Sequence, residues 1–301
     1  MRKLLSLIIV CALISPCAAL LNKNDAGTTA GQFLKLGMGG KAAAMGDAVV
    51  AGVNDSTSII WNPAGLAGIK GNQLSLMHSL YAGDVFYDYL TCAKEFPGVG
   101  TIGIGVQYVN YGSITEMDNL GTELAGFTPY DLAINVAYAL NFSGINAGIN
   151  VKYVSSVIKR TATAFAADLG LQYTVSGVKL GVAAYNLGTG MKFVNDTVGL
   201  PVYLRAGAAY SPMANLMVEA DGEFPADGAI GFGIGAEYLY VLAADMSVVP
   251  RAGYNSINEV SGFKGFTFGL GFNWTTYTLD YALVPFGDMG LVHKMSIGMK
   301  F

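Results

Sequence analysis

Charged residues are scarce in this sequence. Charged residues make up 13% of its 301 positions, against about a quarter in an ordinary soluble domain, while hydrophobic residues make up 52%. The formal net charge is −4. So few charged residues cannot comfortably cover a water-exposed surface, and the acidic excess argues against a nucleic-acid partner.

Cysteine is also scarce, with three residues, two of them in the first 20 positions. That stretch has Arg2 and Lys3, an apolar run from Leu4 to Ile14, and small residues at 17–19, which is the layout of a secretory signal. We expect residues 1–19 to be cleaved on export. Cys92 then remains alone, which excludes an intrachain disulfide and a cysteine-based zinc site. No metal and no cofactor is expected.

Long apolar runs are missing beyond the predicted signal, where no 18-residue stretch is apolar enough for a membrane-spanning helix. An exported chain this hydrophobic can span a membrane in one other way. It can satisfy its backbone groups in a closed β-barrel.

Alternation of apolar and small or polar residues is the pattern that the sequence does have. Segments of this kind number fourteen, an even count, and most have the length of a tilted membrane crossing. They span residues 72–82, 85–96, 101–112, 131–141, 145–157, 163–175, 178–187, 202–211, 215–224, 230–241, 245–255, 265–275, 277–286 and 293–301. The predicted fold is all-β: a 14-stranded antiparallel transmembrane barrel over residues 71–301.

The connections between these segments also alternate. Those after even-numbered segments are short, whereas the long ones, 113–130, 188–201 and 256–264, follow odd-numbered segments. Bacterial barrels have short periplasmic turns and longer outer loops, so this sorting predicts an outer-membrane barrel.

The last segment ends on an aromatic residue. Met295, Ile297, Met299 and Phe301 alternate with polar residues or glycine. This resembles the recognition end of outer-membrane barrels, which implies that the barrel assembly machinery reads this strand. An ordinary amphipathic edge strand is the alternative.

A lumen of fourteen strands is too wide for wall side chains alone to fill. The expected inward face is rich in glycine, which leaves room for a bulky occupant, and we expect residues 20–70 to be that occupant, a partly helical plug. Within it, Thr29 and Gln32 resemble a capping box before a short helix, and a second helix is expected over 41–50.

An Asn-Pro-Ala-Gly element ends the predicted plug. Asn62 precedes Pro63, which favours a turn, and Gly65, after Ala64, gives the chain freedom to redirect. We expect this element to be the plug's exit into the barrel wall.

Ten charged residues are expected to point into the lumen. Charge on the lipid face would cost about 2 to 4 kcal/mol per residue at the midplane. Adjacent strands allow Lys152 to pair with Asp168, Arg205 with Glu219 or Asp221, and Glu237 with Arg251. These charged residues form either a polar lining that anchors the plug or a binding or conducting site. The full set is Lys152, Asp168, Arg205, Glu219, Asp221, Glu237, Arg251, Asp280, Lys294 and Lys300.

Residues 27–68 resemble the N-terminal block of the PorV/PorQ family of outer-membrane proteins, and Asn62, Pro63 and Ala64 are similar to an element in the plug of FadL-type channels. The resemblance implies a 14-stranded barrel with an N-terminal plug in the bacterial outer membrane, in contact with lipid.

Three functions stay open. One is a role in type IX protein secretion, with partner proteins bound through outer loops 113–130 and 188–201. Another is a FadL-like channel for fatty acids or other hydrophobic molecules. The third is a structural barrel with a fixed plug. Catalysis is not expected, because His78 and His293 are the only histidines and no nucleophile motif accompanies them.

Overall fold

The computed structural model describes residues 27–81, 83–258, 265–285 and 290–301. The predicted signal peptide lies outside these residues. Strands dominate the described chain, and their bounds are β1 (Asn72–Leu80), β2 (Phe86–Phe96), β3 (Gly100–Asn110), β4 (Tyr130–Phe142), β5 (Ile145–Val157), β6 (Thr161–Val175), β7 (Val178–Gly188), β8 (Met191–Phe193), β9 (Asp196–Val198), β10 (Tyr203–Met213), β11 (Leu216–Pro225), β12 (Gly231–Tyr238), β13 (Tyr240–Ala243), β14 (Met246–Asn255), β15 (Phe266–Trp274), β16 (Tyr277–Pro285) and β17 (Leu291–Lys300).

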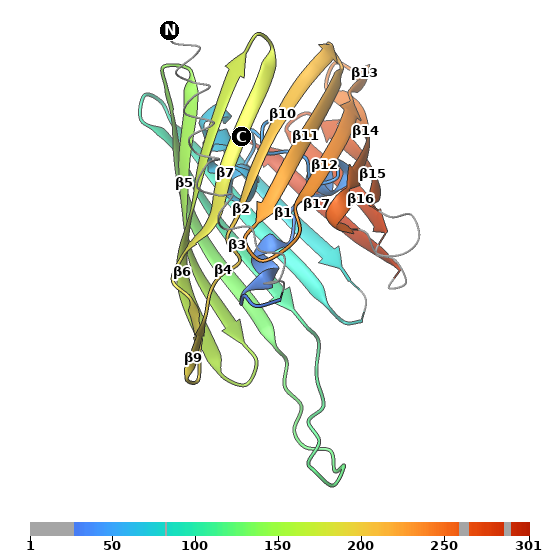
Figure 1. Cartoon of the computed structure of the whole chain (residues 1–301). Helices are drawn as coiled ribbons and strands as arrows, with labels where there is room; N and C mark the ends of the chain where they lie inside the picture. Colours follow the sequence, from blue (N-terminus) through green and yellow to red (C-terminus); the bar gives the residue numbers. More distant parts are fainter. Residues whose placement is uncertain (1–26, 82, 259–264, 286–289) are drawn as a thin grey trace.

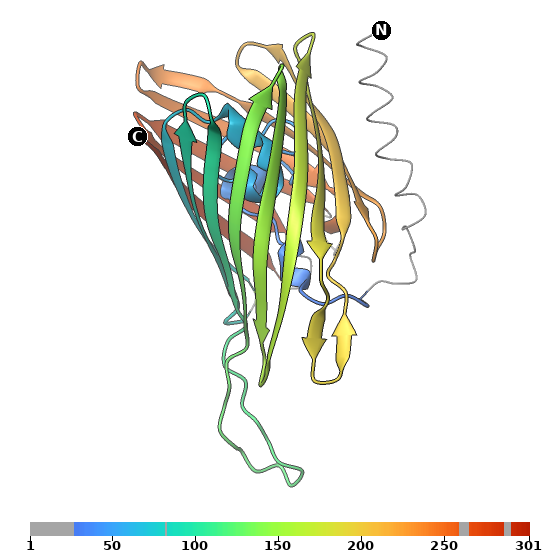
Figure 2. The same ribbon diagram turned by 90° about the vertical axis from the view of Figure 1, so that its left-hand side faces the viewer.

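The large sheet closes into a ring, as Figures 1 and 2 show. Each strand pairs antiparallel with its neighbours, and β1 pairs with β17 at the seam. β12 and β13 form one broken crossing, because both pair with β14. β8 and β9 form a separate hairpin. The described chain is therefore a closed 14-stranded antiparallel barrel, and the predicted fold is confirmed.

Large apolar side chains cover the outside of the ring. Phe266, Phe268 and Leu270 on β15 are half exposed, whereas Thr267 between them is buried. Such outward apolar residues recur on the other strands, as a lipid-facing surface requires.

The two ends of the barrel differ in their connections. Turns of two or three residues follow β2, β4, β6, β10, β13 and β15. Residues 111–129 and the β8–β9 hairpin extend from the opposite end, which Figure 1 shows at the bottom. We call these the short-turn end and the long-loop end.

Residues 27–71, the inner segment, precede β1 and lie within the ring of strands (Figures 1 and 2). Short helical turns make up much of it: η3 (Gln32–Lys35), α2 (Gly40–Ala44), α3 (Ser58–Trp61) and η4 (Pro63–Gly68). A further 3₁₀ turn, η5 (Ser256–Asn258), follows β14.

Among the described residues, helices long and apolar enough to span a membrane are absent.

Two local predictions for the inner segment were wrong. Gly31, with φ +69°, precedes η3 in place of Thr29, whose hydroxyl donates instead to Asp227. The helix expected over 41–50 ends at Ala44, because the chain turns through Gly46 and Asp47 with positive φ angles. Gly46 lies directly against the backbone of Tyr254 on β14, so tertiary packing overrides helix propensity.

Candidate functional site

Glycines of the wall receive the inner segment at close range. A Cβ atom at Gly148 on β5 would overlap the backbone of Pro63, and one at Gly181 on β7 would overlap the carbonyl of Val50. Further along the sheet, Gly235 of β12 lies against Met45 in the same way. The inward glycines thus let two backbones touch, which is the close approach that only glycine permits.

The Asn62-Pro63-Ala64-Gly65 element is buried inside the lumen. Asn62 is extended, its Oδ1 accepts the N–H of Ala64, and its Nδ2 donates to Val50 O and to Leu171 O of β6. The side chain therefore joins two parts of the inner segment to the wall, as a buried amide needs.

The chain reaches the wall after Ile69, close to the expected end of the plug at residue 70, because η4 still packs on β4, β5 and β6. The role predicted for Gly65 was wrong. Gly65 has no positive φ angle, and its hydrogen faces Val53 O and Ser58 Oγ at a distance that excludes a methyl group. Glycine is needed there for contact rather than for freedom to turn.

Two carboxylates of β11 hold four consecutive backbone groups, an arrangement we call the carboxylate clasp. Asp221 Oδ2 accepts the N–H groups of Val49 and Val50 at 2.8 and 2.9 Å. Glu219 Oε1 accepts those of Ala51 and Gly52 at 2.7 and 2.8 Å. Both carboxyl groups are buried, so these bonds replace water that the site excludes.

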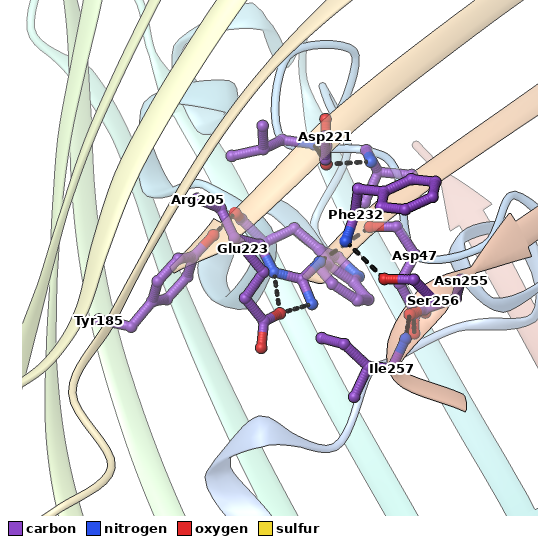
Figure 3. A network of polar contacts seen from close by, with 12 residues as sticks. Asp47, Tyr185, Arg205, Asp221, Glu223, Phe232, Asn255, Ser256 and Ile257 are labelled. Atoms are coloured by element: carbon purple, nitrogen blue, oxygen red, sulfur yellow. Dashed lines mark hydrogen bonds and ion pairs between the residues drawn. The ribbon is translucent and has the colours of Figure 1, made fainter. Parts of the chain in front are cut away.

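Arg205 on β10 is the centre of a second network (Figure 3). Its guanidinium pairs with Glu223, donates to Asp47 O at 2.8 Å and lies 4.9 Å from the ring of Trp61. Tyr185 donates to Trp61 O beside it. One buried cation therefore joins the wall to both halves of the inner segment.

The predicted partners of Arg205 were wrong. Glu219 and Asp221 form the clasp, whereas Glu223 lies directly opposite Arg205 in the register of β10 and β11. The expected pairs of Lys152 with Asp168, at 2.8 Å, and of Arg251 with Glu237, at 2.8 Å, are present.

Three other predicted lumen charges take different positions. Asp280 accepts from Arg251 at 2.6 Å. Lys294 donates to Gly37 O of the inner segment at 2.9 Å. Lys300 is exposed at the short-turn end of β17.

A cavity of about 370 Å³ lies between the inner segment and the short-turn end. Lys41, Glu237, Arg251 and Asp280 line it, and Lys41 lies 3.5 Å from Glu237. Its charged groups are largely paired with each other, so this part of the lumen is polar and nearly neutral.

The lumen toward the long-loop end is apolar. Phe33 and Leu34 of η3 pack there with Met38, and the surrounding wall presents small residues such as Ala164 and Ala166. These side chains fill the space that the small wall residues leave.

The wall is interrupted next to this apolar region. β7 carries one extra residue opposite β6 near Asn186, which has φ +59°, and β7 stays paired with β10 only as far as Tyr185 and Tyr203. Beyond that point the inner segment approaches the loops: Ala30 N donates to Gly199 O at 2.9 Å.

Asp227, in the turn after β11, binds the beginning of the inner segment, residues 29–35. It accepts from Thr29, from Gln32 at 2.8 Å and from Lys35 at 2.5 Å. Burial alone would raise the pKa of Asp227, but the hydrogen bonds from Lys35, Thr29 and Gln32 outweigh it and hold that pKa below its usual range.

The C-terminal residues predicted to form the assembly signal lie on the outside of the barrel. Met295, Ile297 and Phe301 are more than half exposed, and Phe301 N and O bond to Asn72 at the seam. Their role in assembly stays a prediction.

Both histidines also face outward. His78 pairs with Asp88, and His293 with the hydroxyl of Tyr281.

Sequence reasoning missed several anchoring residues, among them Glu223, Asp227, Tyr185 and Asn186. Glu223 alternates with Asp221 and Glu219 along β11, so strict alternation already places it inward. Asp227 and Asn186 lie at a turn and at a bulge, where alternation gives no guidance.

Solved structures share this fold at low sequence identity. The Ralstonia pickettii toluene transporter TbuX has a TM-score of 0.62 and 15% identity, with 88% of this chain and 98% of that chain covered. The Pseudomonas putida toluene transporter TodX has 0.59 and 13%, covering 87% and 96%. A Pseudomonas aeruginosa FadL homologue has 0.53 and 10%, covering 86% and 98%. These likenesses show the fold alone.

No curated protein sequence matches the chain. The family model described as type IX secretion system protein PorV matches residues 20–213, which is more than half of the sequence. An outer-membrane barrel agrees with both comparisons, and the chain belongs to the PorV family.

Proposed function

We propose that this barrel serves type IX protein secretion as a plugged, partner-binding barrel. In this proposal the inner segment is a fixed plug, and loops 113–130 and 188–201 at the long-loop end bind proteins of the secretion system or their cargo. The family match supports the secretion context.

The observation that carries the proposal is the dense anchoring of the inner segment. Wall side chains bond it from β1, β6, β7, β10, β11, β15 and β17, through residues such as Gln172, Thr267 and Ser296. Breaking so many buried bonds together is costly, which favours a plug that stays in place.

The loop of residues 111–129 provides a surface for a partner. It projects well beyond the barrel in both views (Figures 1 and 2) and is held as a narrow hairpin by Ile114 and Phe127, whose backbones bond at 2.8 and 3.0 Å. At its tip Leu120 is 91% exposed and Met117 60%. Apolar side chains displayed this far from the membrane are typical of protein contact sites.

Replacing residues 116–124 with a glycine-serine linker tests the proposal in cells that have a type IX apparatus. We expect export of proteins that carry the sorting domain to fall, and partners that copurify with the barrel to be lost. Shortening the β8–β9 hairpin gives the second loop its own test. Normal export with both loops altered would refute the proposal.

A second candidate is transport of apolar small molecules, favoured by the apolar region around Phe33 and Leu34 beside the interrupted wall. Organic extraction of the purified barrel and mass spectrometry would reveal a bound apolar ligand. Uptake that increases in Phe33→Ala and Leu34→Ala variants would support this function, and unchanged uptake would count against it.

A further inference from the structure

Two cross-strand rows of outward side chains meet at the barrel seam. The register of β17, β1, β2 and β3 places Met295, His78, Asp88 and Tyr108 in one row. It places Ile297, Leu76, Leu90 and Val106 in the next row, nearer the short-turn end. A hollow of about 570 Å³ lies along them, which we call the seam groove.

The seam groove differs in its two rows. One is wholly apolar, whereas the other has two hydrogen-bonded ionisable side chains at its centre, with His78 Nδ1 2.6 Å from Asp88 Oδ1. These side chains are 54% and 43% exposed, so they are not shielded by the protein. Ionisable groups on a lipid-facing wall are unfavourable unless a polar partner meets them.

The position of His78 and Asp88 along their strands indicates their depth in the membrane. His78 is two residues from the end of β1, about 7 Å along the strand. Phe86, Tyr108 and Tyr130 form a chain of tilted ring contacts beside it, with centroids 6.1 and 5.8 Å apart. Aromatic girdles mark the boundary between acyl chains and head groups. The pair therefore lies near the head groups of the leaflet at the long-loop end.

We propose that the seam groove binds one phosphate-bearing membrane lipid. An acyl chain lies along Leu76, Leu90 and Ile297, and the phosphate meets His78. Asp88 occupies Nδ1 of the imidazole, which leaves Nε2 for the head group, and an imidazolium ring donates from Nε2 to the phosphate. Asp88 orients the ring and balances its charge.

A lipid fits the seam groove better than a protein does, because the groove continues the apolar outer surface and its polar row stands at head-group depth. The inference is independent of the secretion or transport role. It concerns the outside of the barrel, whereas those roles concern the loops and the lumen.

Native mass spectrometry of the full barrel tests the inference. Barrel stripped of lipid in a maltoside detergent is incubated with dioleoyl phosphatidylglycerol or with dioleoylglycerol, which lacks the phosphate. We expect one phosphatidylglycerol to stay bound under conditions that remove dioleoylglycerol. His78→Ala should weaken retention by about tenfold or more, the loss of one charge-assisted hydrogen bond.

His293→Ala is the matched control, since His293 also faces outward and bonds Tyr281 but lies outside the groove. Leu90→Trp fills the hollow while His78 and Asp88 are retained, and it should displace the lipid as well; it keeps the test open if His78→Ala does not fold. Equal retention of the two lipids, equal retention by all three variants, or a copurifying protein on this face in place of lipid would overturn the proposal.

Discussion

Glu219 and Asp221 lie two residues apart on β11, and together their carboxylates accept the backbone N–H groups of four consecutive residues. Residues 49–52 are thus held through their main chain, whatever their side chains are. Removing one carboxylate leaves buried donors without a partner, at a cost of about 1 to 3 kcal/mol for each.

Glu219→Ala should therefore loosen residues 49–53. We expect amide hydrogen exchange of Ala51 and Gly52 to accelerate, while exchange in the wall strands stays slow. Glu219→Gln keeps an acceptor oxygen and should protect these amides better than Glu219→Ala does. Equal protection in all three proteins would show that the clasp does not hold the segment.

Arg205→Ala should have a larger effect, because it leaves Glu223 buried without its partner and frees both Asp47 O and the face of Trp61. Breaking a buried pair in this way costs about 3 to 5 kcal/mol. We expect new conductance in planar bilayers as the inner segment loosens.

Replacing both members of that pair, in Arg205→Met with Glu223→Leu, provides the comparison. The double variant should conduct less than Arg205→Ala, since no buried charge is stranded. Unchanged conductance in a correctly folded Arg205→Ala barrel would count against an anchoring role.

Gly148→Ala should displace the Asn62-Pro63-Ala64 element, because the added methyl group overlaps the Pro63 backbone. A Cβ atom at Gly199 has no neighbour within 4 Å, so Gly199→Ala is the matched control. We expect faster proteolysis of the inner segment in the first variant alone. Equal resistance would show that the wall moves to accommodate the methyl group.

Acidification should loosen residues 29–35, which Asp227 binds. Its depressed pKa means that Asp227 stabilises the folded state above the pKa of the unfolded chain, about 3.9, and that this contribution is lost as the pH falls through the lower folded value. Amide exchange of Leu34 and Leu36, corrected for the intrinsic pH effect, should rise below about pH 4.

Asp227→Asn should show the same rapid exchange already at pH 7, and the pH step should disappear. A step that persists in this variant would assign the titration to another group.

Phe301→Ala should slow barrel assembly without weakening the assembled barrel. Its ring is 63% exposed, whereas the contacts that close the seam use its backbone. Heat modifiability on gels, followed over time after synthesis, measures assembly. Leu291→Ala, also outward on β17 but at its far end, should assemble at the normal rate.

The strands could be predicted from the sequence because lipid on one side and a packed lumen on the other impose a period of two. The conformation of the inner segment could not. Its turns at Gly46 and Asp47 are set by contact with β14, which no local pattern records.

Of the lumen ion pairs, too, some could be predicted from the sequence and others could not. Lys152 with Asp168 follows from strand order alone. Arg205 with Glu223 depends on the register of β10 and β11, in which β10 has an extra residue between Tyr210 and Met213. A bulge of one residue moves every cross-strand partner beyond it, and its position is not evident from alternation.

The glycine contacts of the lumen constrain how the barrel can form. The inner segment touches β5 and β7 on one side and β12 and β14 on the other, with backbone against backbone. A segment held by such close contacts is difficult to insert into a ring that has already closed. We therefore expect the wall to wrap around residues 27–71 before β17 meets β1, so that the inner segment is the core around which the barrel closes.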